Sequence, residues 1–390
     1  MTRIIPSMKK TIAVILVFVL VIGAAFADFK FSGGAKVVWG YDFINNETTI
    51  GGRDLLSNGD TAAANLVFRV TGDYFSFNFG GALYSRSNGY EGINARITLR
   101  GKPLFKEAGI EITKLDQLDF LIGNQIIRAN KVYADPLSRD DGAMQLLLAT
   151  NSKYLPAGIE LGTKNWTVKI GGSIKKDHEE IGGNLRLRLL DGAVWAEAGY
   201  AYNSDTTEPS STNRIGHKFE DGGNGHRAGA SFAVDIAKII DKEDLNLVLS
   251  GDVQLNFDDK DANAYFAAAV VKKDSFIFGA EYRSLPKTVT DDDKVKPKTK
   301  VRINAVEGKV SYKFTEAKLT PQLEATAGYV LSRKNIEGEA ELDDKGLMWS
   351  ASGSVTILGL TIKLGYSFRE FEPDKYYGRS NAFLELNFKF

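Results

Sequence analysis

The segment Phe29–Phe43, with the sequence FKFSGGAKVVWGYDF, decides the fold because its side chains alternate in character along almost its whole length. Apolar residues and small residues occupy the odd positions. Polar residues and glycine occupy the even ones, with Val38 as the apolar exception. This period of two is typical of a β-strand with one apolar face. The segment is much longer than the usual strand of about 5–6 residues, so we expect a tilted strand that crosses a bilayer and extends beyond it.

Aromatic residues gather at both ends of this apolar face. Phe29 and Phe31 stand at one end, and Trp39, Tyr41 and Phe43 stand at the other. Membrane-spanning strands concentrate aromatic side chains at the two membrane–water interfaces. The placement therefore predicts two interfacial girdles.

The same alternation returns along the chain, in segments that share a period of two: Phe75–Leu83, Leu245–Phe257, Leu319–Leu331, Leu347–Ile357, Leu360–Arg369 and Asn381–Phe390. In the last of these, alternate positions from Ala382 to Phe390 are apolar, and Phe383 is the one apolar residue on the other side. A strand that finishes on phenylalanine suits the closing strand of a membrane barrel.

Short and long connections alternate between these segments. The short ones are Thr71-Gly72, Asp191-Gly192, Lys272-Lys273, Thr315–Ala317 and Leu358-Gly359. The long ones, which are rich in Asp, Asn, Gly, Ser and Lys, are Ile44–Thr61, Ser85–Gly92, Asn203–Gly225, Leu285–Lys300, Ser332–Lys345 and Glu370–Ser380. Bacterial outer-membrane barrels have short periplasmic turns and longer outer loops.

These patterns predict an all-β fold, a transmembrane antiparallel β-barrel of up-and-down topology with about 18 strands and a range of 16–20. Four strands are expected before residue 101 and twelve after residue 164. Gln117–Ile126 and Ala157–Thr163 supply two more, and Ile110–Leu115 with Met144–Ala149 would raise the total to 20. Side chains also alternate along the strands of a soluble β-sandwich or propeller. The preference for a membrane barrel therefore depends on strand length and aromatic placement.

Residues 1–27 read as a cleaved secretory signal, which leaves residues 28–390 as a single barrel domain. Arg3, Lys9 and Lys10 precede an uncharged run, and Ala25-Phe26-Ala27 forms an A-x-A cleavage pattern. The alternative is a membrane-spanning helix, although the run from Thr11 to Ala27 has the shortest length that can span a bilayer.

Composition excludes several classes of function. The chain has no cysteine, hence no thiolate metal site and no thiol nucleophile. Removal of the signal takes three basic residues from 49, so 46 Lys+Arg face 49 Asp+Glu, a net charge of −3 that does not suit a nucleic-acid binder. The three histidines lie at no spacing typical of catalysis, and Asp259–Asn263 lacks the glycine and glutamate of a calcium loop. We therefore expect neither an enzyme, nor a metal, nor a cofactor.

The polar phase of the strands predicts what lines the lumen. The basic candidates are Lys30, Lys36, Arg69, Arg96, Arg100, Lys169, Arg186, Arg188, Arg227, Arg283, Lys309, Lys313, Lys363 and Arg369; the acidic ones are Asp42, Asp119, Glu197, Asp235, Asp252, Glu281, Glu307, Glu324 and Glu385. Charged pore walls select ions by sign, so the basic excess predicts a weak anion preference. The alternative is a wide channel hydrated by pairs of opposite charge.

A second candidate site is the long connection Ile127–Pro156. It carries Arg128, Lys131, Asp135, Arg139, Asp140 and Asp141, together with apolar residues that could pack it. A loop of this kind can fold into the lumen and narrow it. A surface loop or an additional hairpin is the alternative.

With these features the chain resembles the general diffusion porins of outer membranes, and its first strand, Phe31–Asp42, is similar to the opening of the porin-like outer-sheath proteins of spirochaetes. The resemblance implies a barrel of 16 to 18 strands, a homotrimer, and a pore-constricting loop after the fifth strand. It also implies periplasmic chaperones and an assembly machinery that reads the last strand ending at Phe390.

The function expected from this resemblance is passive diffusion of small hydrophilic solutes across the outer membrane. A substrate-selective channel for sugars would show an aromatic track in the lumen, for which Trp166 and Trp195 are the candidates outside the girdle. An adhesin or structural barrel would use Asn203–Gly225 and Leu285–Lys300 to bind partners and would conduct poorly.

Overall fold

The chain was analysed as a computed structural model, which describes residues 28–44, 46–49, 62–84, 89–123, 157–175, 178–203, 225–242, 244–258, 263–289, 299–335, 341–342, 346–370 and 380–389. The secretory signal predicted for residues 1–27 lies outside these residues. No helix in this described part is both long and apolar enough to cross a membrane.

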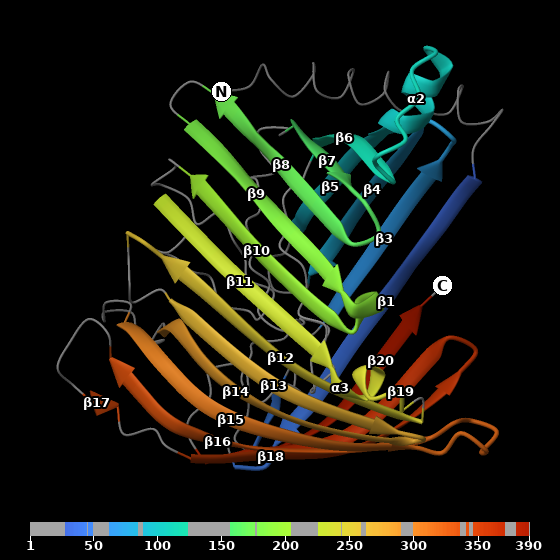
Figure 1. The fold of residues 1–390 in the computed structure, drawn as a ribbon. Coiled ribbons are helices and arrows are strands. Elements are labelled where there is room, and N and C mark those ends of the chain that lie inside the picture. The colour runs from blue at the N-terminus through green and yellow to red at the C-terminus, as the bar shows by residue number, and fades with distance from the viewer. Residues whose placement is uncertain are drawn as a thin grey trace.

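Eighteen long strands of the described chain form one closed ring (Figure 1). They are β1 (Asp28–Asp42), β3 (Ala62–Thr71), β4 (Phe75–Tyr84), β5 (Gly89–Arg100), β6 (Gln117–Gly123), β7 (Ala157–Gly162), β8 (Trp166–Lys175), β9 (His178–Leu189), β10 (Val194–Asn203), β11 (Gly225–Asp235), β12 (Leu245–Asn256), β13 (Ala264–Lys273), β14 (Phe276–Val289), β15 (Thr299–Lys313), β16 (Gln322–Asn335), β18 (Gly346–Ile357), β19 (Leu360–Arg369) and β20 (Ser380–Lys389). Two short strands, β2 (Glu47–Thr49) and β17 (Glu341–Leu342), extend the sheet beside β1 and β16.

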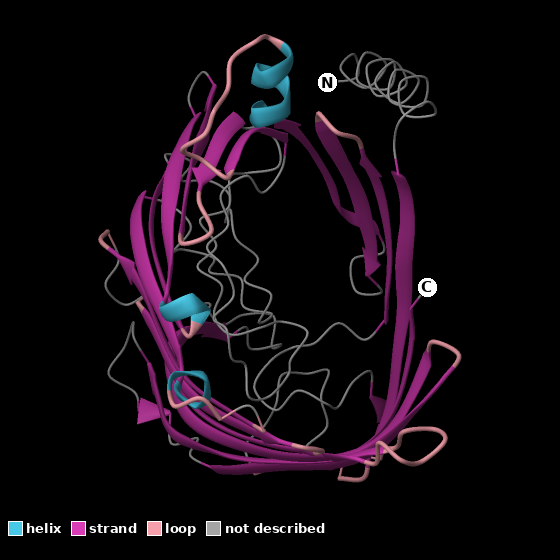
Figure 2. Ribbon diagram, turned by 45° about the vertical axis from the view of Figure 1, so that its right-hand side comes forward, coloured by secondary structure: helices cyan, strands magenta, loops and turns pink. Residues whose placement is uncertain are grey.

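Each strand pairs antiparallel with its neighbours along the chain, and β1 pairs with β20 to close the ring. The closing register runs from Gly34 opposite Lys389 to Asp42 opposite Asn381. Figure 2 looks into the ring and shows strands around its whole circumference. The prediction of an 18-strand up-and-down barrel is confirmed.

The five connections predicted to be short all lie at one end of the barrel, which we call the short-turn rim. Asp28 pairs with Thr71 beside the first of these turns, and the backbone N–H of Lys389 donates to Gly359 in the last. The predicted turn at Asp191-Gly192 is confirmed within a 3-10 turn at Leu190–Gly192, where both Asp191 and Gly192 have positive φ. Short turns lie on the periplasmic side of outer-membrane barrels.

Several local predictions were wrong, including the bounds of two long connections, because Gly89–Gly92 belongs to β5 and Leu285–Val289 to β14. Ile110–Leu115 forms no strand, because the chain after β5 turns into helix α2 (Gly101–Glu107) and then runs irregularly to β6. The turn predicted at Lys272-Lys273 lies two residues later, at Asp274-Ser275, since Lys273 still pairs with Phe276. Met144–Ala149 lies outside the described residues.

Helix α2 is fixed to the short-turn rim by side-chain contacts. The Tyr74 hydroxyl donates to Glu107 at 3.0 Å, and the ammonium of Lys102 donates to the carbonyl oxygen of Leu115. The Glu107 carboxylate accepts the hydrogen bond from the Tyr74 hydroxyl and thereby raises the pKa of the Tyr74 phenol. A second short helix, α3 (Ile236–Ile239), lies between β11 and β12 at the same rim, with Asp235 as its N-cap.

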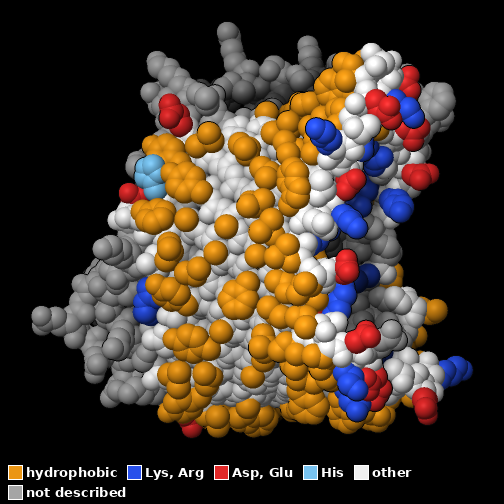
Figure 3. Space-filling view, in the orientation of Figure 1, with side chains coloured by type: hydrophobic (Ala, Val, Ile, Leu, Met, Phe, Trp, Pro, Cys, Tyr) orange, Lys and Arg blue, Asp and Glu red, His pale blue; other side chains and the backbone are white. Residues whose placement is uncertain are grey.

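The alternation separates an apolar outer face from a polar inner face. Phe31 and Leu364 are 63% and 65% exposed, whereas Asp42, Lys363 and Glu385, which belong to the opposite phase, are buried. Figure 3 shows hydrophobic side chains spread over the outer face of the wall, with charged side chains gathered along its right-hand edge. An apolar outer band of this kind suits contact with lipid.

Aromatic side chains form clusters near both rims of the outer face. Near the short-turn rim, Tyr312 packs against Phe276 and Phe314, with ring centroids 4.5 and 4.7 Å away. Near the other rim, Tyr41 packs against Phe43 and Trp349 against Tyr366, with ring centroids 5.3 Å apart in both pairs. These clusters agree with the two interfacial girdles predicted from the sequence.

Phe383, the exception in the last strand, points to the inner face and covers a glycine. It lies directly opposite Gly365 and is buried. A Cβ added at Gly365 would lie 2.5 Å from the Phe383 ring. Gly251 has the same relation to Phe232 on the outer face. An aromatic ring over a cross-strand glycine restores the packing that the glycine lacks.

An arginine at Leu364 should destabilise the barrel because it would place a charge on the lipid face in the middle of β19. The expected loss in free energy of unfolding is about 2–4 kcal/mol. Denaturant titration of the Leu364→Arg protein in lipid vesicles measures it. Ser354→Arg, on the inner face of β18, is the control. An equal loss in both variants would contradict the assignment of the two faces.

Candidate solute pathway along the inner wall

The pairing register places every charged lumen residue predicted from the sequence in one inner phase. Lys36, Arg69, Arg96, Arg186, Arg188, Asp252, Arg283 and Lys363 lie in this phase through successive cross-strand partners, and Arg369 and Arg227 occupy register positions of the same phase. A slip of one residue in any pairing would turn a whole strand over. The consistent phase around the closed ring therefore defines one continuous polar wall.

A buried network of three charges links β15, β16 and β19. Glu324 accepts from the ammonium of Lys309 at 2.6 Å and from that of Lys363 at 2.8 Å. The Lys309 side chain is almost completely buried, and Glu324 supplies a counter-charge for it within the wall. Around this network, Gln322 donates to Ser311 at 2.7 Å, and the Thr326 and Ser350 hydroxyls lie 2.6 Å apart.

A second network joins β9 and β10. Glu197 accepts from the Asn184 amide at 2.6 Å and forms an ion pair with Arg186 at 3.3 Å. The guanidinium of Arg188 lies over the Trp195 ring, 4.7 Å from its centroid, which is a favourable cation–π distance. Trp195 itself is held by a hydrogen bond from its indole N–H to the carbonyl oxygen of Gly192.

A third group lies on β12, β13 and β14. Asp252 is opposite Phe266, and Phe266 is opposite Arg283, so an aromatic ring separates the carboxylate from the guanidinium. Arg283 forms an ion pair with Glu281 and lies 5.8 Å from the Phe266 centroid. Asp252 is only 7% exposed, and its two oxygens have no hydrogen-bond partner among the described residues.

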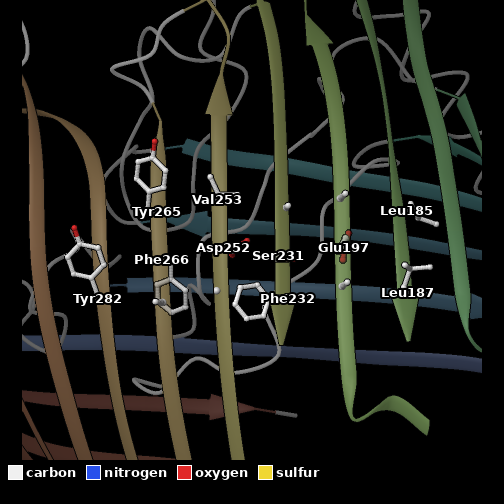
Figure 4. Close-up of a pocket in the computed structure, with 15 residues that line it drawn as sticks. Leu185, Leu187, Glu197, Ser231, Phe232, Asp252, Val253, Tyr265, Phe266 and Tyr282 are labelled. Carbon is white, nitrogen blue, oxygen red and sulfur yellow. The ribbon is translucent and has the colours of Figure 1, made fainter. Parts of the chain in front are cut away.

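A hollow on the same stretch of wall belongs to the outer face and is not part of the pathway (Figure 4). Its apolar lining comes from side chains of the outer phase, Leu185, Leu187, Phe232, Val253, Tyr265 and Tyr282, while Glu197, Ser231, Asp252 and Phe266 contribute from the inner phase of the same strands. The exposed aromatic rings around this hollow suit contact with lipid.

Some site predictions cannot be placed. The constriction candidates Arg128, Lys131, Asp135, Arg139, Asp140 and Asp141 lie outside the described residues, and so does Phe390. Among the described residues, no three His, Cys, Asp or Glu side chains gather as metal ligands would.

Trp166 was wrong as a candidate for the lumen. It pairs with Leu187, which lies on the outer face, whereas Trp195 pairs with Arg188 on the inner face. Trp166 is the first residue of β8, directly after the turn from β7. It lies on the face opposite to that of Thr167 and Lys169, which are inner-phase residues of the same strand.

The sequence reasoning also missed Glu160, whose carboxylate lies 3.2 Å from Lys169 on the neighbouring strand. Its signal was present in Ala157–Gly162, where Gly158, Glu160 and Gly162 alternate with Ala157, Ile159 and Leu161. The segment is short, and two of its three inner positions are glycine, so the polar phase was weak.

Comparison with known proteins supports the fold without giving a family. No protein-family model matches the chain, and none of the curated proteins matches its sequence. Solved structures do match it. Wzi of Escherichia coli, described as a carbohydrate-binding β-barrel involved in capsule assembly, has a TM-score of 0.51 and 10% identity over 95% of this chain and 86% of its own.

Two similar structures come from Pseudomonas aeruginosa. OccK2 has a TM-score of 0.51 and 9% identity over 93% of this chain and 97% of its own. The outer-membrane protein OprD has a TM-score of 0.50 and 8% identity over 93% of this chain and 94% of its own. At these identities the likeness shows the fold alone. This chain has the fold of outer-membrane β-barrels, and the porin-like architecture expected from the sequence is confirmed.

Replacement of Glu324 by glutamine should destabilise the barrel because it leaves Lys309 and Lys363 without their shared counter-charge. Loss of one partner from a buried ion pair costs about 3–5 kcal/mol. Denaturant titration of Glu324→Gln in lipid vesicles measures the change. Glu316→Gln in the exposed turn between β15 and β16 is the matched control. A loss no larger than that of the control would show that the network does not stabilise the wall.

Proposed function

We propose that this protein is an outer-membrane channel through which small hydrophilic solutes and ions diffuse passively. The observation that carries the proposal is the closed 18-strand ring, in which all predicted lumen charges share the inner phase while the outer face is apolar. Barrels of 16–18 strands are wide enough to enclose an aqueous channel. Diffusion down a gradient requires neither a cofactor nor a catalytic group, so the proposal includes no enzyme activity.

The proposal includes export and assembly. Residues 1–27 would direct secretion and be removed, and residues 28–390 would insert into the outer membrane with help from periplasmic chaperones and the barrel-assembly machinery. The last strand, which leads to Phe390, would be read by that machinery. Aromatic girdles and an apolar band support contact with lipid on the outer face. A homotrimer is part of the same expectation from the resemblance to porins.

A weak anion preference is the finer part of the proposal. Several inner cations are neutralised by ion pairs, namely Lys169, Arg186, Arg283, Lys309 and Lys363. These pairs fit a hydrated mixed wall. The inner positions of β1, β3 and β5 differ, because Lys30, Arg69 and Arg96 have no carboxylate opposite them. This uneven distribution supports a net preference for anions.

A substrate-selective channel is the second candidate, favoured by Trp195 on the inner wall beneath the Arg188 guanidinium. An aromatic ring beside hydrogen-bonding side chains is the kind of surface on which sugar rings pack. Such a channel would show conductance that a fitting sugar blocks in a saturable manner. A general diffusion channel would lack this block.

The refolded mature chain should form large, stable and ohmic steps in a planar bilayer, because water and ions fill an open barrel of this size. In a salt gradient, the reversal potential should take the sign of anion selectivity. Protein left in denaturant is the control for insertion artefacts. No conductance from a correctly folded barrel would contradict the channel proposal and favour an adhesin or structural barrel. A cation-selective potential would overturn the anion preference alone.

A further inference from the structure

Three basic side chains form a row on the inner face near the short-turn rim. Lys30 on β1 is opposite Arg69 on β3, Arg69 is opposite Asn78 on β4, and Asn78 is opposite Arg96 on β5. Neighbouring strands lie about 4.8 Å apart, so the row spans about 15 Å of the wall. Lys30 and Arg69 are exposed.

The exposed side chains of this row face the lumen and not the lipid. Phe31 and Phe68, which pair with each other one position along the same strands, belong to the outer phase, and Phe31 is one of the most exposed apolar residues. Successive side chains of a strand point to opposite faces. Lys30 and Arg69 therefore face the inside of the barrel.

In the described chain, no ion pair with a carboxylate neutralises this row, and Asp28 is the one acidic residue at a neighbouring inner position. The adjacent inner positions are Ser32, Val67, Gly80 and Asn94 on one side and Asp28, Thr71, Ser76 and Thr98 on the other. In the described chain, Arg69 donates from Nε to the Asn78 Oδ1 at 2.6 Å and makes no ion pair with a carboxylate. The Nε of Arg96 is buried without a hydrogen-bond partner. Asn78 adds a neutral donor, its amide nitrogen, between the two arginines.

Five other cations of the inner wall are neutralised by carboxylates and differ from this row in that respect. Lys169, Arg186, Arg283, Lys309 and Lys363 each have a carboxylate partner on their own or a nearby strand. Three cations in one row repel one another, and an anion placed among them removes that repulsion. Guanidinium groups donate in a planar fork that matches phosphate oxygens.

We propose that Lys30, Arg69 and Arg96, with the Asn78 amide, form a binding site for small multivalent oxyanions of the phosphate and pyrophosphate type inside the periplasmic mouth of the barrel. The site rests on the proposed channel function and gives its solute class. Two arginines with a lysine at one edge can contact a multiply charged oxyanion from several sides. A monovalent ion such as chloride satisfies fewer of these donors and binds more weakly.

The first experiment measures single-channel current in potassium chloride while pyrophosphate is added to one side of the bilayer. Pyrophosphate should reduce the current in a saturable manner, and at lower concentration from the side of the short-turn rim. The double variant Arg69→Gln/Arg96→Gln should weaken this block by about tenfold for each arginine removed, since a charge-assisted hydrogen bond corresponds to a factor of about this size.

A matched control removes two charges from the same rim without touching the row. Lys272 and Lys313, on β13 and β15, occupy inner-phase positions near the short-turn rim and are exposed. Lys272→Gln/Lys313→Gln should leave the block nearly unchanged. An equal loss in both double variants would overturn the proposal, because it would show a general effect of lumen charge. Absence of block in the unaltered channel would overturn it too.

A second measurement separates failure of the site from failure of the channel. Titration calorimetry of the folded barrel in maltoside micelles measures pyrophosphate binding without any conductance. These micelles contain no phosphate, so a lipid headgroup cannot be the source of the ligand. Binding that is lost in Arg69→Gln/Arg96→Gln and kept in the control supports the site even if the barrel does not conduct. No binding by the unaltered protein overturns the site and leaves the channel proposal standing.

Discussion

The pairing of β1 with β20 is the constraint on which the rest of the structure depends. An open sheet leaves a row of unpaired backbone N–H and C=O groups at each edge, and lipid offers these groups no hydrogen bonds. The closing register between Gly34–Asp42 and Asn381–Lys389 removes both edges at once. Inside this register, Asp42 adds a side-chain acceptor that receives the backbone N–H groups of Ile44 and Ser380. The two ends of the chain are thereby joined near the rim opposite the short turns.

Closure also fixes the phase of every strand. Once β1 and β20 are paired, a one-residue slip anywhere in the ring would turn the side chains of one strand from water to lipid. The chain avoids such a slip even where its residues are unusual. The bulge between Asn304 and Ala305 shifts the register of β15 against β16, yet Glu307 and Lys309 remain in the inner phase. Phe383 likewise faces inward without disturbing β20, because its ring occupies the space that Gly365, which has no side chain, leaves open.

These constraints explain what could be predicted from the sequence and what could not. The period of two in Phe29–Phe43 and Asn381–Phe390 predicts both the strands and the side of each lumen charge, because alternation is a property of one strand alone. Partners are a property of several strands. Nothing within β15, β16 or β19 alone shows that Glu324 meets both Lys309 and Lys363, since their sequence distance is bridged only by the register. Trp166 was misplaced for a related reason, since its phase is set at a turn and not by a long alternating run. The short segment around Glu160 carried too little alternation to reveal its lysine partner.

The ion pairs and the unpaired row have different physical roles in such a wall. A buried pair such as Lys309–Glu324 exchanges the hydration of two charges for their mutual attraction, which keeps the polar wall ordered. Because the two charges cancel, the pair exerts little electrostatic field on a solute in the lumen. An exposed cation without a partner keeps both its hydration and its field, and that field acts on solutes near the wall. The ion pairs of Lys169, Arg186, Arg283, Lys309 and Lys363 lie on β7 to β19, whereas Lys30, Arg69 and Arg96 on β1, β3 and β5 have no carboxylate opposite them. The two arcs of one ring thus differ in electrostatics although they share the same alternation. The polar phase of each strand makes the inner wall hydrophilic, whereas the distribution of counter-charges between strands decides which solutes that wall attracts.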